Sequence, residues 1–330
     1  MKINTSTFND FVKNATVMWR RGFERVPLRA KQLYDVSHNQ LLTTEHSSLD
    51  GFTYANRKTE GDDYHQENPT QNYSKTMTKY RVGEKAVITW EMRTYDKYRE
   101  ISRVLSGLGE AVSQRMELDL THRFTFGTAT SYTDKNGVAV STTVGDGFAL
   151  FYSAHTVKGS STTYRNIIAN NPAFSRSGLE AAEKLFATQM INSAGVKVVV
   201  MPDTIISTED PNTVNTVKEY LKSTANPSSL NSGVANVYKS KYDHIILPLL
   251  ATDNGGNFDS TKEKYWMLAE KSHTDAILEI SENPHMVSPT PGKNSEDFDN
   301  DDWLFKASAA YGIEITDPKW IVLSKGDLSA

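Results

Sequence analysis

Apolar residues recur at spacings of three and four positions between residues 96 and 122, which predicts one long amphipathic helix. At about 1.5 Å per residue such a helix is about 40 Å long. Gly107 and Gly109 lie in its middle, and each costs about 1 kcal/mol relative to alanine. We therefore expect either a bend there or the close approach of another backbone. The apolar face consists of Ile101, Val104, Leu105, Leu108, Val112, Met116 and Leu120.

A long hairpin is predicted over residues 51–93, with strands at 51–57 and 75–93. The segment between them, 61–74, contains two tyrosines and no aliphatic residue. Each arm of about 20 residues reaches about 60 Å, whereas a compact domain of this size has a radius of gyration of about 20 Å. An isolated two-stranded ribbon is marginally stable in water. We therefore expect this hairpin to extend beyond its own domain and to lie on a neighbouring surface.

Two shorter helices follow. The first, at 177–192, begins with a capping box at Ser177 and is followed by Gly195, which is placed to stop it. The second, at 211–222, begins after Asp210, a residue type that caps helices.

A continuous apolar run at 196–201 predicts a buried strand, which Pro202 ends. A polar loop is expected at 281–302. Further strands are predicted at 138–142, 149–152, 244–250, 264–269, 276–280, 303–315 and 319–323.

The first 31 residues carry seven basic and two acidic side chains and few apolar ones. This composition predicts a charged arm with one short helix. An arm with little core of its own is usually disordered unless another surface holds it, and we expect that surface to belong to another subunit. The candidate contact residues are Lys13, Trp19, Arg20, Arg21, Arg25 and Arg29.

Composition excludes several classes of protein. The 330 residues include no cysteine, so disulfides, thiolate metal sites and cysteine nucleophiles are absent. The mean hydropathy of -0.51 and the lack of a long apolar run argue against a transmembrane helix, so no membrane partner is expected. The first thirty residues lack the apolar region of a secretory signal. The net charge of -4 is unlike the basic balance of sequence-reading nucleic-acid binders.

Motifs for catalysis are missing, because the chain has no Walker loop, GxGxxG, GxSxG or HExxH. We interpret Gly145-Asp146-Gly147 as an isolated turn and His155 as a structural histidine. The spacing of the acidic residues near position 300 copies the start of a calcium loop, but Asp302 stands where that loop has glycine. A solvated acidic loop is therefore expected, with a bound cation as the alternative. Its residues are Glu296, Asp297, Asp299, Asp301 and Asp302. We assign no catalytic, cofactor or metal site.

Three stretches resemble segments of tailed-phage major capsid proteins with the Hong Kong 97-type fold. Residues 147–155 (GFALFYSAH), followed by Asn166, resemble the G-x-x-L-F-x-x-x-H stretch of Mu-type head subunits. Residues 196–202 resemble the strand that enters the axial domain, and residues 305–322 resemble the closing strand pair. The order of charged arm, long hairpin, long helix and mixed segments also resembles this family over nearly the whole chain.

The resemblance implies an α+β, Hong Kong 97-like capsid fold. Its parts would be an N-terminal arm at 1–48, an extended E-loop at 49–93, and a peripheral (P) domain with a long spine helix at 94–195 and 301–330. An axial (A) domain would occupy 196–300. The lysine and asparagine that crosslink chains in some members have no match here, so no crosslink is expected.

The implied function is that of a non-enzymatic major capsid protein. It would self-assemble into pentamers and hexamers of an icosahedral phage shell around double-stranded DNA, with weak non-specific DNA contact. Assembly would occur in the host cytoplasm and the product would be the virion. Because the chain lacks the long helical N-terminal segment that scaffolds one branch of the family, a separate scaffolding protein is expected, together with portal and decoration proteins. The E-loop residues expected at the intersubunit contact are Arg57, Lys58, Asp62, Asp63, Tyr64, Tyr73 and Lys75.

Two other hypotheses remain open from the sequence. An encapsulin-like cargo compartment shares the same fold, and a soluble hydrolase with a carboxylate site outside known motifs belongs to a different class.

Overall fold

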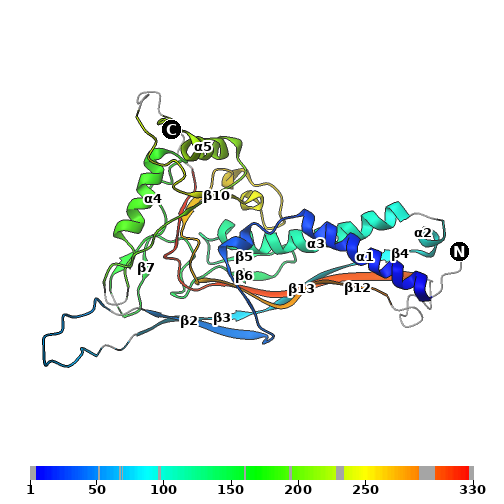
Figure 1. The fold of residues 1–330 in the computed structure, drawn as a ribbon, viewed down its shortest axis with the longest axis horizontal. Coiled ribbons are helices and arrows are strands. Elements are labelled where there is room, and N and C mark those ends of the chain that lie inside the picture. The colour runs from blue at the N-terminus through cyan, green and yellow to red at the C-terminus, as the bar shows by residue number, and fades with distance from the viewer. Residues whose placement is uncertain are drawn as a thin grey trace.

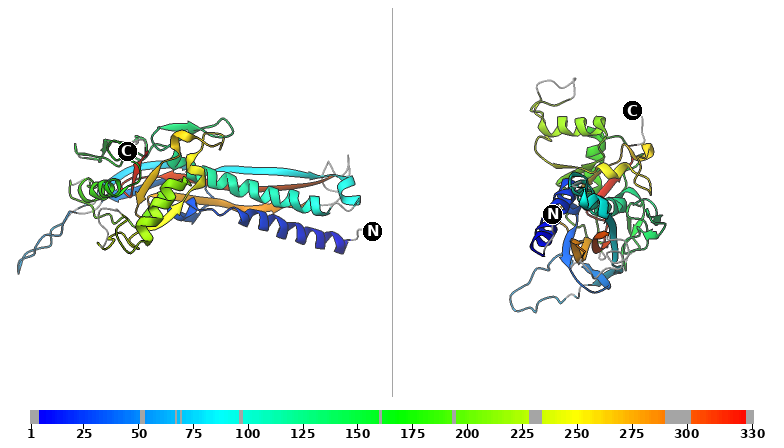
Figure 2. Two further views of the ribbon diagram at one scale, coloured as in Figure 1. Left: turned by 90° about the horizontal axis from the view of Figure 1, so that it is seen from above. Right: turned by 90° about the vertical axis from the view of Figure 1, so that its right-hand side faces the viewer.

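The structure, a computed structural model, is elongated, with helices α1 and α3 along one end and a second helical part at the other (Figure 1). A thin ribbon projects sideways from the body in each view (Figures 1 and 2). The described residues are 5–50, 53–66, 68, 70–95, 98–159, 161–192, 195–227, 234–289 and 302–326.

The helices of the two ends of the molecule differ greatly in length. The longest is α3, whose buried face carries the apolar residues that the sequence pattern placed there. The α-helices are α1 (Thr5–Arg25), α2 (Trp90–Thr94), α3 (Tyr98–Thr125), α4 (Arg176–Thr188) and α5 (Pro211–Lys222), and the 3-10 turns are η1 (Ala30–Leu33), η3 (Pro248–Ala251) and η4 (Ser260–Lys262).

A four-stranded sheet lies against α1 and α3 in the long part of the molecule (Figure 1). Its order is β1-β12-β13-β4, with β1 parallel to β12 and the other neighbours antiparallel. Aromatic contacts from Phe11 of α1 to Trp303 and Phe305 of β13 join the helical layer to the sheet. The strands are β1 (Asp35–His38), β4 (Tyr80–Ile88), β12 (Ala276–Val287) and β13 (Trp303–Ile315).

A second four-stranded sheet has the order β10-β9-β11-β14. Helices α4 and α5 pack on it through a separate apolar cluster, in which Phe186 and Val217 meet Ile205 and Trp266. Its strands are β9 (Thr204–Ser207), β10 (Asp243–Ile246), β11 (Trp266–Ala269) and β14 (Ile321–Ser324).

Three two-stranded pairs complete the fold. The largest, β2 with β3, forms the projecting ribbon and is antiparallel. The pairs are β2 (Thr43–Asp50) with β3 (Thr70–Thr78), β5 (Ser131–Thr133) with β6 (Ala139–Ser141), and β7 (His155–Thr156) with β8 (Thr163–Tyr164).

Two glycines allow α1 and α3 to approach closely. A Cβ atom on Gly22 would lie 2.0 Å from the Ser106 carbonyl oxygen, and one on Gly109 would lie 2.2 Å from the Trp19 carbonyl oxygen. The close backbone approach expected at Gly109 is therefore confirmed, and the partner is the chain's own N-terminal helix. Because α1 spans 21 residues, the expectation of one short helix in the arm was wrong.

Several sequence predictions hold closely. The long helix, the helix after Asp210 and the strand at 303–315 are all present. The Asp210 carboxylate accepts hydrogen bonds from the Asn212 and Thr213 backbone N–H groups, as its capping role predicts.

Other predictions need correction. Ser175, not Ser177, caps α4 by accepting from the Gly178 N–H. Residues 196–201 form no strand; the buried strand begins after them, at Thr204. Residues 149–152 also form no strand, and the expected polar loop at 281–302 begins later, because β12 continues to Val287.

The sheets cross the domain boundaries expected at residues 48, 93, 195 and 300. Strand β1, from the expected arm, and β12, from the expected A domain, lie in one sheet with β13 of the expected P domain. Strand β4, expected in the E-loop, is an edge of that sheet. Strand β14, expected in the P domain, pairs with β11 in the other sheet.

Candidate functional site

The tip of the projecting ribbon is exposed along its whole described length. Residues 54–66 form no helix or strand, and every side chain there is exposed. The Lys58 ammonium lies 4.1 Å from the centre of the Tyr64 ring, which is itself 83% exposed. The expected contact residues Arg57, Asp62 and Asp63 share this tip.

The base of the ribbon, in contrast, is held by a buried ion pair. Lys79 follows β3, and its Nζ lies 2.6 Å from Oε2 of Glu279 in β12; both side chains are at most 5% exposed. Lys79 Nζ also donates to the Leu41 carbonyl at 2.6 Å. Thr44 of β2 donates to the same carboxylate at 2.8 Å. Burial raises the pKa of Glu279, but the hydrogen bonds from Lys79 and Thr44 outweigh it and hold that pKa below its ordinary value.

A second ion pair fixes β3 farther toward the tip. Lys75 Nζ lies 2.8 Å from Glu314 Oε1 of β13, and both side chains are largely buried. Lys75 also donates to the Thr143 hydroxyl at 3.2 Å. Burial lowers the pKa of Lys75, which Glu314 partly restores.

Between these ion pairs, β3 crosses β13 at Gly312. A Cβ atom at that position would lie 2.8 Å from Met77 Sδ and 3.0 Å from Lys79 Cγ. Glycine therefore leaves the room in which the ribbon packs on the sheet, and Met77 is fully buried there.

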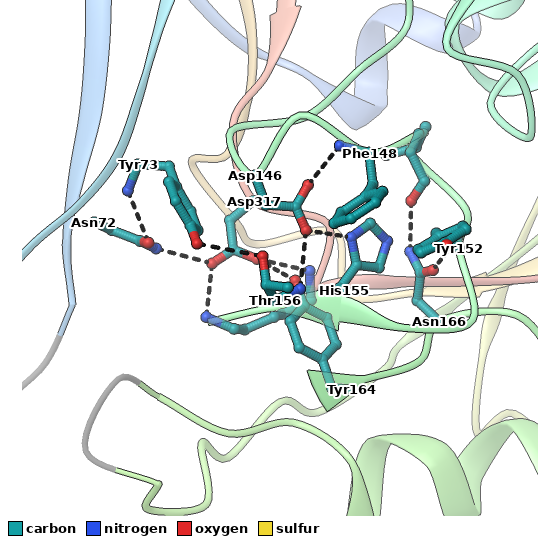
Figure 3. A network of polar contacts seen from close by, with 12 residues as sticks. Asn72, Tyr73, Asp146, Phe148, Tyr152, His155, Thr156, Tyr164, Asn166 and Asp317 are labelled. Atoms are coloured by element: carbon teal, nitrogen blue, oxygen red, sulfur yellow. Dashed lines mark hydrogen bonds and ion pairs between the residues drawn. The ribbon is translucent and has the colours of Figure 1, made fainter. Parts of the chain in front are cut away.

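A polar network holds the end of β3 that is nearer the tip (Figure 3). The Asn72 amide donates to Asp317 Oδ2 at 3.4 Å, and the Tyr73 hydroxyl lies 3.2 Å from the Thr156 hydroxyl. Asp146 Oδ2 accepts from the Thr156 backbone N–H at 3.2 Å. The ribbon is thus tied both to the loop of residues 144–166 and to the C-terminal segment.

His155 serves this network as a structural residue. It is fully buried, and its Nδ1 lies 2.8 Å from Asp146 Oδ2. Its ring stacks on Tyr164 with centroids 5.1 Å apart. Asn166 closes the same loop by accepting from the Tyr152 N–H and donating to the Leu150 carbonyl. The G-x-x-L-F-x-x-x-H stretch thus belongs to the loop that contacts the ribbon (Figure 3).

A family model described as "Phage capsid protein" matches residues 73–324. The chain belongs to this family of phage capsid proteins. The matched region contains both four-stranded sheets apart from β1, and it includes most of the ribbon's second strand.

Solved structures share the fold of this capsid protein at low sequence identity. The procapsid protein of bacteriophage JBD30 matches with a TM-score of 0.52 and 11% identity, covering 99% of this chain and 77% of its own. The Gordonia phage Cozz structure has a TM-score of 0.52 and 9% identity, covering 89% and 84%. The virus-like particle from Pyrococcus furiosus has a TM-score of 0.50 and 11% identity, covering 94% and 98%. No curated protein is significantly similar in sequence.

The family match and the shared fold identify the chain as a Hong Kong 97-type, α+β major capsid protein of a virion. Such proteins assemble into shells from copies of themselves. The projecting ribbon overlaps the segment that the resemblance assigned to the E-loop, residues 49–93, and we use that name for it. The likeness to the virus-like particle shows the fold alone, and the phage capsid family match favours the phage shell over the cargo compartment.

The arm of the capsid protein packs on its own chain. Trp19 is only 6% exposed within the core between α1 and α3, so the expectation that it anchors on another subunit was wrong. Arg25 lies 3.0 Å from Glu110 of α3, and Arg29 donates to the Ile246 carbonyl at 3.2 Å. Four expected cations are exposed on α1, namely Lys13, Arg20, Arg21 and Arg25.

Two of the expected E-loop contact residues face inward. Tyr73 belongs to the polar network and Lys75 to the second ion pair, both of which join β3 to the body, so neither is part of the exposed tip. Glu279, Glu314 and Asp317, which hold the base, were missed. Charged residues inside otherwise apolar strands are the signal that marks the first two.

Of the five acidic residues expected in the loop near position 300, Asp302 lies within the described residues. Glu296, Asp297, Asp299 and Asp301 lie outside the described residues. Asp302 accepts from the Trp90 backbone N–H at 3.3 Å. Within the described ranges, no cluster of three metal-ligating side chains occurs, and no helix is long and apolar enough to cross a membrane.

Proposed function

We propose that this major capsid protein forms the pentamers and hexamers of an icosahedral phage head around double-stranded DNA. Each E-loop would lie across an adjacent subunit of its ring. Such a contact is heterologous, and repeated rotation closes it into rings. Many modest contacts acting together then stabilise the shell.

One observation carries this proposal: the E-loop is fixed at its base and has no covering surface at its tip. The buried ion pairs of Lys79 and Lys75 hold its origin, whereas residues 54–66 are exposed throughout. Fixing an arm before it binds reduces the entropy lost on binding. An E-loop with a fixed base and an exposed tip is suited to contact a neighbouring copy.

The other partners follow from chemistry and from the family. The exposed cations Lys13, Arg20 and Arg21 on α1 suit an anionic surface, which is either packaged DNA or an acidic partner protein. A scaffolding protein would set curvature, a portal would occupy one vertex, and assembly would take place in the host cytoplasm. We propose a structural role without catalysis.

Removing the E-loop tip tests the proposal. Asp50 and Thr70 are paired across the ribbon, so a two-residue turn can replace residues 51–69 without disturbing the base contacts. We expect a soluble subunit with the circular dichroism and melting temperature of the wild type, but no shells by negative-stain microscopy. Normal shells from a folded variant would contradict the proposal.

A further inference from the structure

Residues 196–201 have a strand-like sequence but form only an isolated antiparallel bridge, between Lys197 and Ile191, within the described residues. The exposure of their side chains alternates, as in a strand that is covered on one face. Val198 and Val200 pack against the second apolar cluster. On the opposite face Val199 is 75% exposed and Met201 is 71% exposed.

The backbone of this segment is only partly hydrogen-bonded. The Val198 N–H donates to the Met190 carbonyl at 2.9 Å, and the Met201 N–H donates to Glu270 Oε1 at 3.3 Å. Among the described residues, the N–H groups of Lys197 and Val199 and the carbonyls of 197–201 have no partner. An unpaired edge of this kind is a template for another strand.

A second segment with the same property lies in the E-loop. Residues 51–57 have a strand-like sequence, yet the backbone of 54–58 has no hydrogen bond to any described residue. Tyr54 is 73% exposed. The two segments therefore have similar lengths, unpaired backbone groups and exposed apolar side chains.

Their charges are complementary. Asp203 and Glu270 lie at the Met201 end of the first segment, and neither forms an ion pair within the described residues. Burial and the nearby Asp203 carboxylate raise the pKa of Glu270. In the E-loop segment, Arg57 and Lys58 are exposed and form no ion pair within the described part of the chain.

We propose that residues 54–58 of one subunit's E-loop pair as a β-strand with residues 197–201 of a neighbouring copy. In the parallel direction Arg57 and Lys58 would lie at the Met201 end, beside Asp203 and Glu270 of that neighbour. The inference rests on the proposed function, because it names the surface on which the E-loop lies. It would also complete the pairing of an apolar run that was predicted as a strand but forms only an isolated bridge in the single chain.

The absence of native cysteine makes a crosslinking test clean. The double variant Asn56→Cys with Val199→Cys places thiols at the centres of both segments, so the test does not depend on strand direction. We expect assembled shells treated with a short bismaleimide to give a ladder of covalent oligomers on a denaturing gel. The control, Asn56→Cys with Phe258→Cys, places the second thiol at another exposed site, 68% exposed in the wild type, and should give no ladder.

Shells that form without a ladder, or with equal ladders in both variants, would overturn the pairing and leave the proposed function intact. Failure to form shells from the wild type would instead contradict the proposed function. Hydrogen exchange of unmodified protein gives a second measurement. The Lys197 and Val199 amides should exchange at least about tenfold more slowly in shells than in free subunits, and unchanged rates would overturn the pairing.

Discussion

Lys79 and Glu279 form a buried ion pair, 2.6 Å between Nζ and Oε2, at the point where the E-loop joins the body. Lys79 separates β3 of the ribbon from β4 of the long sheet, and Glu279 lies in β12 of that sheet. The pair therefore links the direction of the E-loop to the position of the long four-stranded sheet.

Replacing Glu279 with glutamine should destabilise the free subunit strongly. The substitution leaves the Lys79 ammonium buried without its counter-charge, which costs about 3–5 kcal/mol when one partner of a buried pair is removed. Urea unfolding of the free subunit measures this loss. A change below about 1 kcal/mol would mean that Lys79 finds another partner or water.

The double variant Lys79→Met with Glu279→Leu separates stability from assembly. Because well-packed apolar side chains often replace a buried ion pair without loss, we expect the double variant to be much more stable than Glu279→Gln. It should nevertheless form fewer regular shells, because the Leu41 carbonyl and the Thr44 hydroxyl lose their partners at the ribbon's base. Regular shells at wild-type yield would contradict the positioning role.

Gly109→Ala should separate α1 from α3. Its new Cβ would lie 2.2 Å from the Trp19 carbonyl oxygen, so the backbone of α1 must move. Overpacking of this kind costs about 1–3 kcal/mol, measured by urea unfolding. Gly107→Ala is the matched control two residues away, where no atom lies within 4 Å; it should stabilise the helix by about 0.5–1 kcal/mol. Equal effects of the two substitutions would contradict the close helix contact.

Glu117 should make the subunit less stable as the pH rises toward neutrality. Its carboxylate is buried and accepts the Ala30 N–H at 3.0 Å, and burial raises its pKa from 4.5 to about 7. The folded state therefore binds more protons than the unfolded state between these values. The free energy of unfolding falls as the pH rises from 4.5 to about 7, by about 3 kcal/mol for this group.

Glu117→Gln tests this effect because glutamine keeps an acceptor for Ala30 but does not titrate. We expect the variant to gain stability relative to the wild type by about 2–3 kcal/mol between pH 4.5 and pH 8. His122, whose pKa burial lowers to about 4, has the opposite slope, but it is present in both proteins and cancels in the difference. A pH-independent difference would contradict the raised pKa.

The exposed cations of α1 should matter for assembly more than other surface cations. We expect Arg20→Glu with Arg21→Glu to lower the yield of filled particles far more than Lys218→Glu with Lys222→Glu, an exposed pair on α5. The measurement is the particle yield on a density gradient, with folding checked by circular dichroism. Equal yields from both variants would indicate that the charges of α1 are interchangeable with any others.

Sequence periodicity correctly predicted the helices and strands that pack against other parts of the same chain. The strand at 303–315 and the helix at 211–222 have their predicted bounds because each buries an apolar face against its own subunit. The long helix was predicted for the same reason. The resemblance over residues 147–155 likewise indicated a segment that contacts the ribbon. His155 was predicted from the sequence to be structural, and it is buried there.

The rest depended on contacts that local sequence does not encode. Ionic partners such as Lys79 and Glu279 are far apart along the chain and meet only through sheet topology. The run at 196–201 was predicted as a buried strand from its apolar content, yet it forms only an isolated bridge and one of its faces is exposed. Arm burial was underestimated because the glycine contact between α1 and α3 joins segments that are more than 80 residues apart.

Assembly with and without a partner protein tests how curvature is set. Pentamers and hexamers use nearly equivalent contacts, so small free-energy differences leave the product poorly specified without a template. We expect the protein expressed alone to give aggregates, tubes or shells of mixed size, and co-expression with the neighbouring assembly genes to give one size. Shells of a single size from the chain alone would favour a self-sufficient compartment.

Cryo-electron microscopy of the co-expressed particles tests the central claim most directly. We expect closed icosahedral shells of pentamers and hexamers, with each E-loop lying across an adjacent subunit. A preparation that contains only folded monomers, or shells in which residues 54–66 contact no neighbouring subunit, would contradict it.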